Sequence, residues 1–93
     1  MTVEIGVVLV PLAANPSVRE ELAIPDDAAA TGYVVREQNL AVEVHYTTRE
    51  RQPIPRRVQT TMGPGAVVHG ARHFLTYEWL GQLWHVFVEV DQE

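Results

Sequence analysis

The stretch FLTYEWLGQLWHVFV, residues 74–88, decides the predicted fold. Apolar and polar residues alternate on both sides of a Gly-Gln pair, a pattern typical of two half-buried strands joined by a tight turn. A type II′ turn at Gly81-Gln82 predicts a hairpin in which Trp79 lies opposite Trp84 and Glu78 lies opposite His85. The inner face of this hairpin then carries both tryptophans together with Leu75, Tyr77, Val86 and Val88.

Upstream of this hairpin, further segments have the composition of strands. Residues 33–37 and 40–47 predict a second hairpin, in which a two-residue turn places Val35 opposite Val42. Residues 58–62 predict one more strand, which a Gly-Pro-Gly sequence ends. Antiparallel pairing between neighbouring segments is therefore the expected pattern.

The N-terminal segment predicts a strand with an unusual distribution of side chains. Residues 3–12 begin with alternating apolar and polar positions, but Val8 and Val10 join Val7 and Leu9 to make both faces apolar. A strand of this kind is either central in its sheet or covered by something outside the domain.

One segment predicts a short helix. Residues 16–23 follow Asn15, which can cap a helix, and they begin with Pro16 at the first helical position. Glu20 and Glu21 are acidic residues near the helix start, where the helix dipole favours negative charge. This helix would have only two turns.

Length and composition limit the fold further. The chain has 93 residues, of which 25 are Val, Ile or Thr, and this length is sufficient for one core. We predict a mainly β fold in which residues 1–93 form a single β-rich domain: a small antiparallel sandwich, or a partly open barrel or roll, of about five to six strands with one short helix at about 16–23. The absence of Cys excludes disulfides, thiolate zinc sites and a Cys nucleophile.

Charge and hydropathy narrow the range of partners. The net charge of −5 is the wrong sign for binding nucleic acid by bulk electrostatics. The longest apolar stretch, residues 5–14, is interrupted by Gly6 and Pro11 and is too short to span a membrane. We therefore expect no membrane partner and a cytoplasmic location, or a place in the virion if the chain is phage-derived.

Four histidines raise the question of a metal site. His45, His69 and His73 are the candidates, but on a strand His69 and His73 would lie about 13 Å apart, too far to share one ion. His85 is expected to pair with Glu78. We predict no metal, no other cofactor and no catalytic residue. A small ligand-binding or metal-dependent enzyme that uses His45, His69 and His73 remains the alternative.

A basic segment interrupts the acidic chain. Residues 49–57 contain four Arg and one Glu, a local net charge of +3, and two prolines that predict an extended loop. Arginine binds carboxylates and phosphates with two parallel hydrogen bonds. Three interpretations follow: the arginines pair with the domain's own acids, they contact an acidic partner such as a second copy, or they bind a nucleotide or nucleic acid. The lack of interleaved aromatic residues disfavours nucleic acid.

The outer face of the C-terminal hairpin carries more apolar surface than an isolated domain usually exposes. We therefore predict a non-catalytic β-rich interaction or assembly subunit, which homo-oligomerises or docks as a small structural or accessory component of a larger complex, for example a phage or viral one. The predicted partner-binding residues are Arg49, Arg51, Arg56, Arg57, Phe74, Leu80, Leu83 and Phe87.

Overall fold

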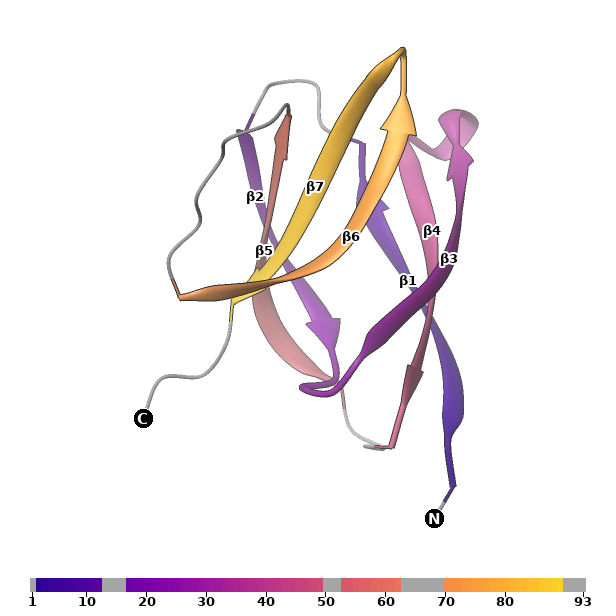
Figure 1. Ribbon diagram of the computed structural model, residues 1–93, viewed down its shortest axis with the longest axis vertical. Coiled ribbons are helices and arrows are strands. Elements are labelled where there is room, and N and C mark those ends of the chain that lie inside the picture. Colours follow the sequence, from indigo (N-terminus) through magenta and orange to yellow (C-terminus); the bar gives the residue numbers. More distant parts are fainter. Residues whose placement is uncertain (1, 13–16, 50–52, 63–69, 90–93) are drawn as a thin grey trace.

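The computed structural model describes residues 2–12, 17–49, 53–62 and 70–89. In this part of the chain, two antiparallel sheets pack face to face (Figure 1). The strands are β1 (Glu4–Pro11), β2 (Ser17–Ile24), β3 (Ala29–Arg36), β4 (Ala41–Thr48), β5 (Ile54–Met62), β6 (Ala71–Trp79) and β7 (Gln82–Glu89). A single turn of 3₁₀ helix, η1 (Glu37–Asn39), lies between β3 and β4.

The first sheet has the strand order β1-β4-β3, and the second has the order β2-β5-β7-β6. The predicted mainly β fold is confirmed, but seven strands in the described residues exceed the predicted five to six. Side chains from both sheets form one core between them, which contains Val8, Val10, Ile24, Ala28, Val42, Val44, Tyr46, Val58, Phe74, Leu75, Tyr77, Trp84, Val86 and Val88.

The predicted helix at 16–23 is wrong, because the segment from Ser17 onward forms strand β2. β2 pairs antiparallel with β5, in a register that places Ile24 opposite Ile54. Burial alternates along the segment, as in a strand: Leu22 packs against the core and Ile24 is buried. Glu21 and Ala23, which alternate with them, are exposed. A two-turn helix is marginal alone, so pairing along β5 overrides the local helix signals.

The hairpin of β3 and β4 has the predicted register, with Val35 opposite Val42. The connection is longer than the predicted two residues, because η1 and Leu40 both lie between the paired ends. Leu40 adopts a left-handed backbone conformation with φ of 51° and donates its N–H to the carbonyl of Glu37.

The hairpin of β6 and β7 has the predicted inner face but not the predicted register. Its turn is Leu80-Gly81, with φ values of 55° and 71°, and not Gly81-Gln82. Two consecutive positive φ values belong to a type I′ turn, which suits the twist of paired strands. Trp84 therefore lies opposite Tyr77, stacks on its ring at 6.5 Å, and donates its indole N–H to the carbonyl of Trp79. From Leu75 to the turn the shift is two residues, so the side chains there keep their predicted faces.

The predicted loop over 48–57 is also shorter than expected, because β4 includes Thr48 and β5 begins at Ile54. Pro55 is compatible with a strand here, where it lies opposite Ala23 of β2. The arginines at 56 and 57 therefore belong to β5, where they point to opposite faces of the sheet. Arg56 and Arg57 therefore lie in a strand, apart from Arg49, although the sequence predicted one loop for all of them.

Candidate interaction surface

A row of apolar side chains lies on the outer face of β1. Val3, Ile5, Val7 and Leu9 keep 55%, 76%, 51% and 50% of their surface exposed. Val8 and Val10, which alternate with them, are buried in the core. The two-residue period of a strand thus divides this segment into a buried side and an outer side. We call the four exposed residues the β1 row.

β1 is an edge strand and is not central in its sheet. It pairs with β4 through eight consecutive residues, from Glu4 opposite Thr48 to Pro11 opposite Ala41, with no shift in register. β4 alone pairs with it among the strands of the described chain. A central position therefore does not explain why β1 is apolar on both faces.

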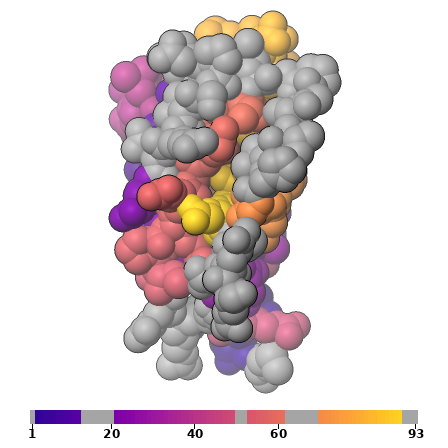
Figure 2. All heavy atoms as spheres, turned by 90° about the vertical axis from the view of Figure 1, so that its left-hand side faces the viewer, coloured from indigo at the N-terminus to yellow at the C-terminus, as the bar shows by residue number. Residues whose placement is uncertain are grey.

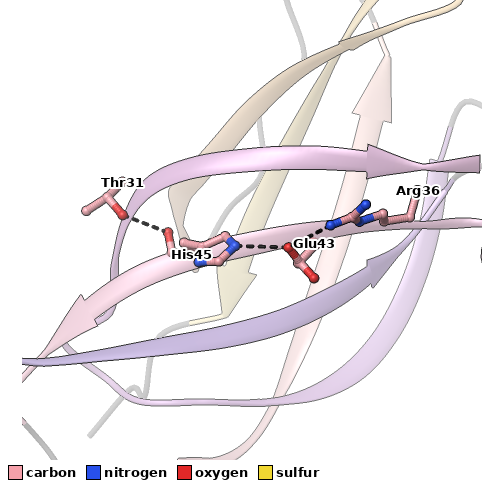
Figure 3. A network of polar contacts seen from close by, with 4 residues as sticks. All are labelled: Thr31, Arg36, Glu43 and His45. Atoms are coloured by element: carbon pink, nitrogen blue, oxygen red, sulfur yellow. Dashed lines mark hydrogen bonds and ion pairs between the residues drawn. The ribbon is translucent and has the colours of Figure 1, made fainter.

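A polar network lies next to the β1 row, on the neighbouring strand (Figure 3). Glu43 and His45 of β4 lie opposite Leu9 and Val7 in the register. His45 donates from Nε2 to Glu43 Oε2 at 3.0 Å, and an Arg36 nitrogen lies 3.6 Å from the same oxygen. The hydrogen bond from His45 and the charge of Arg36 lower the pKa of Glu43 below its ordinary value of 4.5.

The network also fixes the backbone of this sheet. Thr31, beside the bulge in β3, donates its hydroxyl to the carbonyl of His45 at 3.2 Å. The outer face of the β1-β4-β3 sheet is thus apolar along its β1 edge and carries neighbouring charges of both signs in the middle. The charged groups of this face are paired with one another, whereas the apolar side chains of the β1 row have no cover in the described chain. The row is therefore the better candidate for a contact surface.

The predicted arginine surface is divided by the fold. Arg56, with 6% of its surface exposed, points inward and forms an ion pair with Asp26. Arg57 is exposed on the outer face of the sheet, where its Nε lies 3.9 Å from a Glu89 oxygen. Arg49 is exposed, while Arg51 lies outside the described residues. Arg56 is therefore not at the surface where a partner was predicted to contact it, because its charge is paired inside the domain.

The counter-charge of Arg56 lies in the acidic turn after β2, which contains Asp26 and Asp27. The Asp26 carboxylate forms the ion pair with Arg56, and the Asp26 backbone carbonyl accepts a hydrogen bond from Arg72 at 3.1 Å. Asp27 accepts the hydroxyl of Thr48 and the backbone N–H of Arg49, the latter at 2.8 Å. The turn thus holds together the ends of β4, β5 and β6, from both sheets. The interpretation that arginines pair with the domain's own acids applies to Arg56.

The predicted outer face of the C-terminal hairpin is only partly apolar. Leu80 and Leu83 are exposed, as expected, and Phe87 is half-buried beside His73 at 5.7 Å between ring centroids. Phe74 is buried, because a β-bulge between His73 and Leu75 turns it inward against Tyr46. Figure 2 shows this side of the molecule, where parts of β5, β6 and β7 reach the surface.

The two candidate metal ligands that the structure describes, His45 and His73, do not converge. His45 lies on the outer face of the β1-β4-β3 sheet, whereas His73 lies on the outer face of the other sheet, beyond the core. His69 falls outside the described residues. His73 and His85 both contact the hydroxyl of Thr76, at 2.7 and 2.9 Å, so His85 is bonded there and not to Glu78. No group of three metal-ligating side chains occurs among the residues that the structure describes.

A groove that the sequence does not predict lies between the tips of the two hairpins. It has a volume of about 880 Å³ and lies between the β3–β4 connection and the β6–β7 turn. Trp79 spans it by donating its indole N–H to Glu37 at 3.1 Å, and its ring lies 6.0 Å from Trp84. Glu37 and Trp79, which meet across it, are 42 positions apart, so no local sequence signal indicates the groove.

No helix in the described segments has the length and apolar character needed to cross a membrane. In comparisons with known proteins, no family model, no curated protein and no solved structure matches the chain.

Proposed function

We propose that this protein is a non-catalytic β-rich assembly subunit, which homo-oligomerises or docks into a larger complex through the β1 row. The observation that carries the proposal is the exposure of Val3, Ile5, Val7 and Leu9, each half-exposed or more in the single chain. Apolar side chains scattered singly on a surface are ordinary, but a contiguous row typically marks an interaction site.

The position of the row supports association and not merely tolerance of apolar residues. Four side chains that project from the same face of one strand, spaced two residues apart, form a continuous strip about 20 Å long. Covering an exposed aliphatic side chain contributes on the order of 1 kcal/mol when half of its surface is removed from water. The strip therefore favours association by several kcal/mol, opposed by the lost freedom of the two partners.

The arginines have a smaller role in this proposal than the sequence alone suggested. Arg49 and Arg57 remain exposed and can face an acidic partner, whereas Arg56 is buried in an ion pair with Asp26. Leu80 and Leu83 are exposed at the far tip of the molecule from the acidic turn. They supply a second, smaller apolar contact and do not adjoin the β1 row.

The test is the oligomeric state of two matched variants. Ile5→Lys puts a charge into the β1 row, and Leu40→Lys makes the same change at an apolar residue that is equally exposed but lies outside the row. Analytical ultracentrifugation from micromolar to near-millimolar concentration should show self-association of the wild type that Ile5→Lys weakens and Leu40→Lys does not. A monomer throughout, with no partner recovered by pull-down, contradicts the proposal.

A further inference from the structure

We propose that β1 pairs edge to edge with β1 of a second copy of this chain, antiparallel, about a two-fold axis at Val7. The two three-stranded sheets would then join into one six-stranded sheet. This inference rests on the proposed function, because it names the partner and the geometry by which the β1 row meets the same row of a second copy.

The register of β1 identifies which backbone groups face its open edge. Leu12 donates its N–H to the carbonyl of Leu40 at 2.9 Å, at the position where the β1–β4 ladder continues. In an antiparallel ladder the N–H and C=O of one residue point to the same side, and this side alternates along the strand. Because Leu12 points toward β4, the odd-numbered residues Ile5, Val7 and Leu9 point their backbone groups away from it.

The same three residues therefore offer two kinds of contact at once. Their side chains are the centre of the exposed β1 row, and their N–H and C=O groups face an edge that no other described strand pairs with. Pro11 has the same parity, and proline is accepted where its missing N–H faces the edge of a sheet. Its position agrees with the assignment and ends the pairable segment.

The other three sheet edges carry features that oppose pairing within the strand, whereas β1 carries such a feature only at its end, where Pro11 lies. β3 has a bulge before Gly32, and β6 has a bulge after His73. The N–H of Glu78 in β6 is already bonded to the Tyr33 hydroxyl at 3.2 Å. The β2 segment contains the charged run Arg-Glu-Glu at 19–21. Bulges, charges and covered edges are the usual protection against edge-to-edge association.

From Glu4 to Val10, β1 has neither a bulge nor a charged run. Its ladder with β4 is continuous over eight residues, so its edge is regular. Between Ile5 and Leu12 it contains no charged residue, and its one charge, Glu4, lies at the start of the strand. A long, regular and apolar edge is a template for another strand.

The sequence of β1 is self-complementary about Val7. A two-fold axis there places Val7 opposite Val7 of the second copy, and Ile5 opposite Leu9 of the second copy. These pairs exchange about six backbone hydrogen bonds and bring aliphatic side chains together on the outer face. Glu4 lies opposite Val10 of the second copy, so the two acidic side chains are at opposite ends. Such an interface uses the same edge on both copies and closes at two.

The experiment compares two substitutions at Val7. Val7→Ala and Val7→Pro both shorten the apolar contact, but only Val7→Pro also removes the N–H at the centre of the proposed pair. Because this N–H faces away from β4, the monomer should keep its fold, which far-UV circular dichroism checks. We expect the dissociation constant of the dimer to be at least about tenfold higher for Val7→Pro than for Val7→Ala. Equal dissociation constants overturn the pairing.

Cysteine cross-linking tests the register without a proline. The chain contains no Cys, so a single introduced thiol reports one position. Residues opposite each other in a hydrogen-bonded antiparallel pair have Cα atoms about 5.5 Å apart, within disulfide range. Val7→Cys should form a disulfide dimer under mild oxidation, and Ile5→Cys should cross-link with Leu9→Cys in a mixture. Leu40→Cys, equally exposed, is the control. Cross-links no faster than those of Leu40→Cys overturn the pairing.

The outcomes separate this inference from the proposed function. Association that Ile5→Lys weakens, but that shows neither the proline effect nor the cross-links, retains the β1 row as a docking face and overturns only the edge pairing. Cross-links between two Ile5→Cys chains, without the mixed pair, mean either parallel pairing or an antiparallel register centred on Ile5, and they also overturn it. A wild-type chain that stays monomeric up to near-millimolar concentration overturns self-pairing, and recovery of no other partner then overturns the proposed function.

Discussion

Substitution of Gly6 by alanine should destabilise the fold through one identifiable contact. Gly6 lies opposite Tyr46 in the β1–β4 ladder, and the tyrosine ring lies directly over it. A Cβ atom at Gly6 would come within 2.7 Å of Tyr46 Cε1, with the ring's outer atoms closer still. Tyr46 cannot withdraw easily, because it is buried with its ring 6.5 Å from Phe74. Overpacking of this kind costs about 1–3 kcal/mol.

The matched control is the same substitution at Gly32. Nothing lies within 4 Å of a Cβ built there, so no contact opposes the added methyl group. Gly→Ala reduces the freedom of the unfolded chain equally at both sites, which by itself stabilises a compatible strand position by about 0.4–1 kcal/mol. Gly32→Ala should therefore be neutral or stabilising while Gly6→Ala is destabilising. The sign of the difference depends only on the Tyr46 ring.

Urea unfolding monitored by the fluorescence of Trp79 and Trp84 measures both variants. For a domain of this size, 1 kcal/mol corresponds to about 4–8 °C in Tm, so thermal melting provides a second reading. In a Tyr46→Leu background the added cost of Gly6→Ala should fall, because the smaller side chain leaves room for the methyl group. If Gly6→Ala is as stable as Gly32→Ala, or its cost is unchanged beside Leu, the argument from ring contact is refuted.

Three further outcomes follow from the structure. The hydrogen bond from His45 lowers the pKa of Glu43. The contribution of Glu43 to stability is therefore present above pH 4.5 and is lost as the pH falls through the lowered pKa. In that pH range, the Tm of Glu43→Gln should decline less steeply than that of the wild type. Asp26→Asn removes the ion-pair partner of buried Arg56 and should cost about 1–3 kcal/mol in urea unfolding, less than for a fully buried pair because Asp26 is half-exposed; no cost contradicts this. Leu80→Asn places a residue that tolerates positive φ in the β6–β7 turn and should raise stability by about 1 kcal/mol, a gain that an unchanged Tm excludes.

The two hairpins were the most predictable part of the fold, because each is local. The alternation along 33–47 and 75–88 decides which side chains face inward, and these faces agree with the observed burial. The turn at Leu80-Gly81 was not predictable from turn preferences, which favour glycine or asparagine and not leucine at positive φ. The stacking of Tyr77 on Trp84 depends on the register that this turn sets, so it could not be predicted from the sequence.

Features that depend on distant partners could not be predicted. Ser17–Ile24 has local helix signals, and its strand conformation comes from β5, whose paired residues lie 30 or more positions further along the chain. Phe74 is buried because of a bulge, which shifts the alternation by one residue without a glycine to mark it. Arg56 is inward because its counter-charge is in the turn after β2. The candidate surface differs from the predicted one for the same reason. The β1 row is exposed because of the strand order β1-β4-β3, and this order depends on pairing between residues distant in sequence.

The strand order also has a consequence for how the chain folds. Of the five strand pairings in the described residues, only β3–β4 and β6–β7 join neighbours in sequence, whereas β1–β4, β2–β5 and β5–β7 must close larger loops. Folding with mostly non-local contacts is slow, on a scale of milliseconds to seconds. During synthesis β1 leaves the ribosome first and waits for β4 to be made. A nascent chain with this topology should therefore bind a holding chaperone until residue 48 has emerged.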